Sequence, residues 1–154
     1  MGSKRIGLAR VQALVENLKR ELQLNQATLK GGLRDVRAIT ANLTLTADDS
    51  GAIVVPSGAA RTVTLPAPAI GLQYTLIAGS AHQHILQTPS TNIISGFIWD
   101  ATNANTFAAL AVSGGGILTM SANADIGDEL TVFSDGTSWF LKGLCRDTVV
   151  VTTH

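Results

Sequence analysis

Two histidines, His82 and His84, have the spacing of a metal-binding pair. Residues two apart on a β-strand share one face, and imidazole nitrogens are common zinc ligands. No third ligand lies near them in the sequence, and the remaining histidine, His154, is the last residue. We therefore expect a structural or surface role for all three histidines and no bound metal.

Carboxylates and glycines supply two further patterns that could do chemistry. Asp125, Asp128 and Glu129 stand near a turn and could bind a cation. Their spacing does not match an EF-hand calcium loop, so a solvated acidic loop is expected. The glycine run 114–116 lacks the Lys-Ser/Thr of a phosphate-binding loop and precedes a strand-like segment, which favours a glycine hairpin over a nucleotide site.

Nucleophilic catalysis has no recognisable motif in this chain. No Gly-x-Ser-x-Gly sequence is present, although a Ser-His-Asp triad assembled by the fold stays open. The single cysteine, Cys145, cannot form an intramolecular disulfide and is predicted to be a buried, inert thiol. These patterns predict a protein that is not an enzyme and that binds no cofactor.

The elements that carry these residues belong to a chain of 154 residues, enough for one ordinary domain and an appendage. The chain is 45% hydrophobic and only 14% charged, which predicts a folded protein. It has no run of ~20 apolar residues that could cross a bilayer, and no apolar signal core follows Lys4 and Arg5. We expect it to be made and used without export.

Charge is distributed unevenly along the chain. Residues 1–37 hold eight Lys and Arg against three acids, and the remaining residues hold three basic against eight acidic side chains, so the two parts carry +5 and −5. This asymmetry points to contact with an acidic surface or with other copies of the chain. Direct nucleic-acid binding is not favoured, because Glu16 and Glu21 interrupt the basic run and residues 1–37 contain no aromatic side chain for base stacking.

The clearest periodic signal predicts an amphipathic helix near the N-terminus. Its apolar residues follow a 3-4-3-4 spacing that places them in one stripe. Charged residues, among them Arg10, Lys19 and Arg20, fill the intervening positions, and Asn25 continues the register as a polar position. The stripe consists of Leu8, Val11, Val15, Leu18 and Leu22.

This helix is expected to associate with other subunits or with a partner. A short helix is marginal alone, so its apolar stripe must be buried against something. The alternative is a helix packed on its own domain, since two heptads are fewer than the three or four that identify a coiled coil. A membrane-surface role is weaker, because the stripe lacks Trp and Phe. Gly31 and Gly32 predict the end of the helix, followed by a connector to about Ile39.

From Thr40 onward the apolar period changes to two, and turn signals recur at short intervals. Two hairpins are predicted, one joining 110–112 to 117–120 through the glycine run and one joining 129–134 to 138–144 through Asp-Gly. The last strand, 148–152, would be an exposed edge that pairing with a neighbouring subunit would cover. The predicted organisation is an N-terminal helical arm and linker, 1–39, and a single antiparallel β-sandwich or jelly-roll domain, 40–154.

The order of these features resembles virion proteins of tailed bacteriophages, particularly head-decoration (cement) proteins and the β-rich modules of tail fibres and spikes. The resemblance rests on three short stretches distributed between residues 1 and 140. They are MGSKRIGLAR at 1–10 before the amphipathic helix, RTVTLPAPAIG at 61–71, and SDGTSWF at 134–140.

The resemblance implies a non-enzymatic structural protein of the virion, assembled in the host cytoplasm. It implies a homotrimer on the capsid surface that contacts the major capsid protein and clamps the coat lattice. Such proteins act through extended contact area, so no functional residue transfers singly. The interaction residues expected here are those of the helical arm, its apolar stripe together with Arg10, Lys19 and Arg20.

Two other readings of the sequence stay open. One is a receptor- or glycan-binding module of a tail fibre or spike, with Tyr74, Trp99 and Trp139 as candidate stacking residues for sugars, although tryptophans of this kind more often pack in a core or a hairpin. The other is a small β-sandwich enzyme of the cupin-like metalloprotein kind, which the missing set of metal ligands disfavours.

Overall fold

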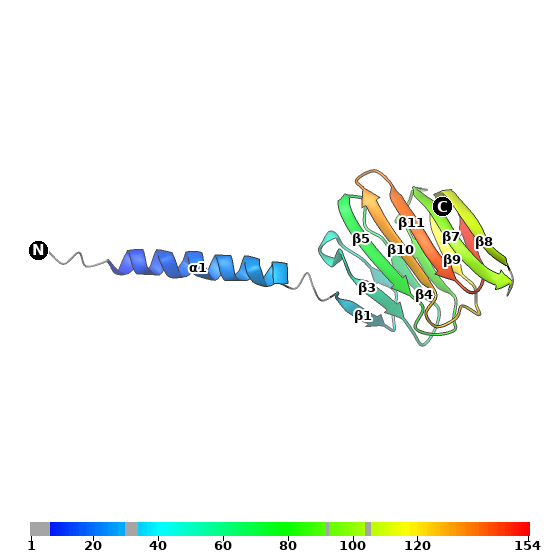
Figure 1. Cartoon of the computed structure of the whole chain (residues 1–154), viewed down its shortest axis with the longest axis horizontal. Coiled ribbons are helices and arrows are strands. Elements are labelled where there is room, and N and C mark those ends of the chain that lie inside the picture. Colours follow the sequence, from blue (N-terminus) through cyan, green and yellow to red (C-terminus); the bar gives the residue numbers. More distant parts are fainter. Residues whose placement is uncertain (1–6, 30–33, 92, 104–105) are drawn as a thin grey trace, which may run out of the picture. The chain divides into compact units, whose positions relative to one another are not determined.

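The computed structural model describes residues 7–29, 34–91, 93–103 and 106–154. Two compact units make up the chain, Met1–Arg34 and Asp35–His154. The first contains one helix, and the second, called the body below, is built almost entirely from β-strands (Figure 1). The protein is therefore mainly β with a helical N-terminal unit, as the sequence predicts.

The helix α1 spans Leu8–Leu29, which confirms the predicted helix, and its predicted stop at Gly31 and Gly32 lies outside the described residues. Its sequence is rich in Leu, Ala, Gln, Glu, Lys and Arg, which are strong helix formers, and it contains neither Gly nor Pro. With this length the 3-4 spacing continues through Asn25 to Leu29, so the register covers three heptads.

The body is a sandwich of two mixed sheets. The seven-stranded sheet has the order β1-β3-β5-β10-β11-β7-β8, and the five-stranded sheet has the order β12-β9-β6-β4-β2. In Figure 1, β3, β5, β10 and β11 cross the body side by side. The strands are β1 Val36–Ile39, β2 Leu43–Thr44, β3 Ile53–Pro56, β4 Arg61–Thr64, β5 Ile70–Ile77, β6 His84–Gln87, β7 Ile94–Asn103, β8 Thr106–Gly115, β9 Ile117–Met120, β10 Glu129–Asp135, β11 Trp139–Cys145 and β12 Val149–Thr152.

The first six strands wind as a coil between the two sheets. Strands β1, β3 and β5 lie parallel in the seven-stranded sheet, whereas β2, β4 and β6 lie parallel in the five-stranded sheet. Each connection crosses from one sheet to the other. Consecutive strands therefore lie in different sheets, and each strand pairs in parallel with the strand two places along the chain, as β1 does with β3. The predicted purely antiparallel sandwich is therefore wrong, and both sheets are mixed.

The second half of the chain contains one of the two predicted hairpins. Strands β10 and β11 pair antiparallel, with Phe133 opposite Phe140 and Ser134 opposite Trp139. The backbone N–H groups of Thr137 and Ser138 both donate to Oδ1 of Asp135 at 2.8 Å, and Gly136 supplies the positive φ of 101° that the turn requires.

The predicted glycine hairpin does not form. Strands β8 and β9, on either side of Gly116, belong to different sheets. The chain crosses the sandwich there, and β9 pairs instead with β6 and β12. The glycines permit a sharp change of direction, which the sequence signal cannot distinguish from a turn between paired strands.

The core lies between the two sheets and is centred on Trp139 and Tyr74. Trp139 is fully buried, and its ring centroid lies 5.7 Å from that of Tyr74. Aliphatic side chains from both sheets surround this pair, including Leu65, Leu86 and Leu118. Cys145 is also buried, as predicted. Burial of this apolar surface is the main source of the body's stability.

Candidate functional site

The apolar stripe of α1 is the first surface that could bind a partner. Val11 and Val15 are each 45% exposed and Leu18 is 58% exposed, so the described residues of the helical unit do not bury them. The neighbouring Leu14 is exposed as well. A helix that carries an apolar stripe of this kind is stable only when another molecule covers the stripe.

The other predicted arm residues are arranged around this stripe. Arg10, Lys19 and Arg20 are exposed, and Lys19 Nζ lies 4.0 Å from Glu16 Oε1, one turn earlier on the helix. The side chains of Leu8 and Leu22 lie outside the described part of the chain, although both positions belong to the helix. The charged side chains leave the apolar stripe free to form the seam of a helical bundle.

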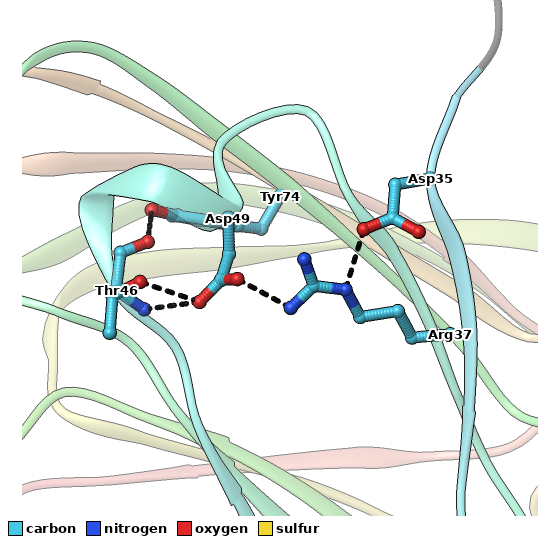
Figure 2. A network of polar contacts seen from close by, with 5 residues as sticks. All are labelled: Asp35, Arg37, Thr46, Asp49 and Tyr74. Atoms are coloured by element: carbon cyan, nitrogen blue, oxygen red, sulfur yellow. Dashed lines mark hydrogen bonds and ion pairs between the residues drawn. The ribbon is translucent and has the colours of Figure 1, made fainter.

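The body begins earlier than the sequence predicts. Residues 36–39, which the sequence assigns to a connector, form the edge strand β1 and pair parallel with β3. Arg37, counted with the basic arm, points into a polar network of the body (Figure 2). Its Nε donates to Asp35 Oδ2 at 2.6 Å, and it also forms an ion pair with Asp49.

This network fastens β1 to the body. Both the backbone N–H and the hydroxyl of Thr46 donate to Asp49 Oδ2, at 2.7 and 2.8 Å, and the Tyr74 hydroxyl donates to the Thr46 carbonyl oxygen at 2.8 Å (Figure 2). The Thr46 N–H is the main cause that lowers the pKa of Asp49, and Arg37 lowers it further. Asp49 therefore stays ionised and links the first strand to the centre of the core.

The two units carry opposite net charges also when the boundary is placed after Arg34. Removing Asp35 and Arg37 from the N-terminal count leaves seven basic and two acidic residues in 1–34, still +5, and the body still carries −5. The positive charge thus belongs to the helical unit and its flanks. An acidic partner surface, or the body of another copy, is the complement that such a unit attracts.

The second exposed surface is the outer face of the seven-stranded sheet. Side chains alternate along a strand, so burial of Trp139 and Leu141 on β11 turns their neighbours outward. Five large apolar side chains from β7, β10 and β11 gather there, and we call them the aromatic face. They are Phe97, Trp99, Phe133, Phe140 and Leu144.

The rings of the aromatic face pack in pairs. Phe133 and Phe140 stack across the hairpin with centroids 5.3 Å apart, and Phe97 and Trp99 meet edge to face at 6.2 Å. A depression of about 280 Å³ opens beside the second pair, and Glu129, Lys142 and Leu144 are among its lining residues. An apolar surface rimmed by charged groups is typical of a contact site.

Only one of the three predicted stacking residues is available to a ligand. Trp99 is 44% exposed on the aromatic face, whereas Tyr74 and Trp139 are buried between the sheets. The prediction is therefore wrong for Tyr74 and Trp139, because both point into the core. The sequence reasoning missed Phe97, Phe133, Phe140 and Leu144, although the predicted hairpin already places Phe133 opposite Phe140.

The two histidines of the metal-like pair have different environments. His84 is fully buried, and its Nε2 lies 3.2 Å from the Ser80 carbonyl oxygen. His82 is exposed, and its Nδ1 lies 3.2 Å from the Ser80 hydroxyl. The pair thus holds the loop before β6. Within the described ranges, no three His, Cys, Asp or Glu side chains are grouped so that they could hold a metal ion.

The acidic loop is only partly solvated. Asp125 is half-buried and forms an ion pair with Arg146 at 3.2 Å, but Asp128 is buried. Its two carboxylate oxygens accept the backbone N–H groups of Asp125 and Arg146, at 3.1 and 2.9 Å. The expectation of a solvated loop is wrong for Asp128, which acts as a structural acceptor that joins the start of β10 to the end of β11.

The buried His84 predicts a pH-dependent stability. Burial lowers its pKa below the usual 6.5, with smaller contributions from His82 and Arg61. Below pH 6.5 the unfolded chain takes up this proton before the folded chain does, so stability falls as pH decreases through that window. Urea denaturation at pH 7.5 and 5.0 should show this loss.

The variant His84→Gln isolates the effect, and His82→Gln is its matched control because His82 is exposed. His84→Gln should reduce the stability difference between the two pH values, while His82→Gln should retain most of it, because burial and not His82 is the main cause that lowers the pKa of His84. Burial raises the pKa of Asp128, so this carboxyl group adds to the stability of the fold as the pH falls further. That effect is present in the wild type and in both variants, so it does not affect their comparison. An unchanged pH dependence in His84→Gln would contradict the assignment.

Within the described residues, no helix is long and apolar enough to span a membrane. Comparison of the sequence with models of known protein families found no match, and comparison with curated proteins found no significant relative.

Proposed function

We propose that this protein is a non-enzymatic structural protein of a virion, a decoration protein that binds the assembled coat lattice as a homotrimer and stabilises it. The observation that carries the proposal is the exposed apolar stripe of α1, which needs a partner to cover it. The resemblance of the sequence to phage virion proteins supplies the class of partner.

Stabilisation of a shell follows from mass action. A protein that binds the assembled lattice, and not free coat subunits, shifts the equilibrium toward the assembled state. A trimer that engages several coat subunits at once gains further affinity, because the later contacts are intramolecular. An extended surface such as that of the helical arm suits this role, since many modest contacts sum to a firm attachment.

The charge distribution supports a lattice-bound arm. The helical unit carries +5 and the body −5. A basic arm is attracted to acidic surfaces, and this attraction guides the initial encounter of the trimer with the coat lattice. The major capsid protein is the proposed partner of the arm, with the body on the outside of the capsid.

A second candidate function is a glycan- or receptor-binding module of a tail fibre or spike. The observation that favours it is the exposed Trp99 beside a depression that also contains Glu129 and Lys142. An exposed aromatic ring flanked by hydrogen-bonding groups can stack on the apolar face of a sugar. A fibre component is present in few copies per particle, so abundance separates the two functions.

The experiment that tests the proposal is the copy number of this protein in purified virions, measured by quantitative mass spectrometry against the major coat protein. We expect about one subunit per coat subunit, because a decoration protein that fills a lattice matches it stoichiometrically. A ratio far below this value would favour the fibre or spike. Absence from virions would overturn both structural roles.

A further inference from the structure

The two outer faces of the sandwich differ in chemistry. The outer positions of the five-stranded sheet are rich in threonine, including Thr62, Thr64 and Thr119, which suit contact with water. The outer face of the seven-stranded sheet instead carries the aromatic face. An antiparallel or mixed sandwich normally exposes polar side chains on both outer faces, so the aromatic face is the one that a partner must cover.

We propose that the aromatic face is the contact between the bodies of neighbouring copies of this chain. The inference rests on the self-association included in the proposed function, but it does not depend on the capsid. It assigns to the body a second subunit contact, separate from the helical stripe.

The first argument for another copy as the occupant is the helix. A heptad stripe is complementary to a like stripe, because each apolar side chain fits between those of a facing helix of the same kind. Association through α1 places several bodies on one assembly at high effective concentration. At this effective concentration, even a weak contact between two identical body surfaces can form.

The second argument is the charge on the aromatic face. Lys142 and Glu129 line the same depression, yet in the described part of the chain no ion pair involves either residue. A surface that presents one cation and one carboxylate beside apolar rings is complementary to itself, since Lys142 of one copy can meet Glu129 of another. A strongly acidic partner would repel Glu129, and a strongly basic partner would repel Lys142.

The third argument is the area. An aromatic side chain buries about 200 Å² when fully covered and a leucine buries less, so the five side chains, exposed to roughly half, offer less than about 500 Å². A stable interface needs about 800 Å² from each partner. The aromatic face therefore falls short alone, and the helical stripe of the same chain supplies the remaining contact.

Trp99 provides a direct test in the purified full-length protein. The chain has two tryptophans, Trp99 and Trp139, and Trp139 is already buried in the core. Quenching of tryptophan fluorescence by acrylamide, a neutral molecule, therefore reports mainly on Trp99. We expect weak quenching in the wild-type oligomer, because a neighbouring body covers Trp99.

The variant Leu144→Asp should expose Trp99. Leu144 lies directly opposite Trp99 in the pairing of β11 with β7 and is 57% exposed in the single chain, so the change introduces a charge at the contact without disturbing the core. The acrylamide quenching constant should increase several-fold. Val150→Asp, on the outer face of β12 and 52% exposed, is the matched control and should leave quenching unchanged.

Three results would overturn the inference. The first is a wild-type protein whose quenching equals that of Leu144→Asp, and the second is a monomeric wild type by light scattering. The third is a Trp99 that becomes shielded only when capsids or glycans are added, which assigns the face to that partner. A shielded Trp99 in a protein absent from virions would instead contradict the capsid role alone, so the two failures are distinguishable.

Discussion

Gly96→Ala is expected to prevent stable folding of the body. Gly96 lies opposite Leu141 where β7 pairs parallel with β11. A Cβ at this position would lie 2.0 Å from the Leu141 carbonyl oxygen and 2.8 Å from its backbone nitrogen. These are backbone atoms, so no side-chain rotation can relieve the overlap, and β7 would have to separate from β11 in the seven-stranded sheet.

The expected loss exceeds about 4 kcal/mol, which is a large part of the stability of a domain of this size. Thermal or urea denaturation of the soluble protein measures it, and insolubility would agree with it. Gly58→Ala is the matched control, because Gly58 has a positive φ of 79° but open space around its Cβ position. Gly58→Ala should cost about 1 kcal/mol. Equal stability of the two variants would contradict the close-approach argument.

Replacing both Val15 and Leu18 by aspartate is expected to abolish self-association and attachment to capsids. Both side chains are exposed on the isolated helix and lie in the apolar stripe. Losing the burial of two such side chains costs about 3 to 6 kcal/mol per helix. This loss corresponds to on the order of 100-fold or more in the association constant. Light scattering should show a monomer, and sedimentation with capsids should show little bound protein.

The control variant places the same added charge on other faces of α1. Ala13 and Asn17 are exposed and lie outside the heptad stripe, so aspartate at both positions should leave the oligomer and the capsid occupancy unchanged. Circular dichroism should show an intact β-body in both variants, because the substitutions lie outside Asp35–His154. Unchanged occupancy in the stripe variant would contradict the role of the arm.

The helix was the most predictable element, because its period of 3.6 is a property of the local sequence. Its C-terminal end was less predictable, since Gln, Asn and Thr after Leu22 weaken the apolar pattern but do not interrupt a helix. The hairpin around Asp135 and Gly136 was predictable for a similar reason. An Asp-Gly turn between two segments of alternating apolar and polar residues strongly favours antiparallel pairing of those segments.

The pairing of the other strands could not be read from the sequence. A period of two identifies which side chains share a face, but it does not identify which strand lies alongside. Consecutive strands from β1 to β6 look like hairpin partners in sequence, yet each crosses to the opposite sheet. Only the packing of both sheets around Trp139 and Tyr74 decides between these arrangements.

The aromatic face was predictable in part. Trp139 and Phe140 are adjacent, so one of them must point outward on a strand, and the predicted hairpin assigns Phe133 to the side of Phe140. The sequence does not say which side is the core. Segment 97–99 is apolar at both parities, so the exposure of Phe97 and Trp99 depends on its position beside β11.

The coil of β1 to β6 has a consequence for how this body could have grown during evolution. Each turn takes about 20 residues and adds one parallel strand to each sheet, as a repeat does in a solenoid. Duplication of one turn would lengthen the sandwich while every existing side chain kept its face. A single-residue insertion within a strand would instead reverse inside and outside beyond it. Descendants of this fold should therefore differ in length by whole turns.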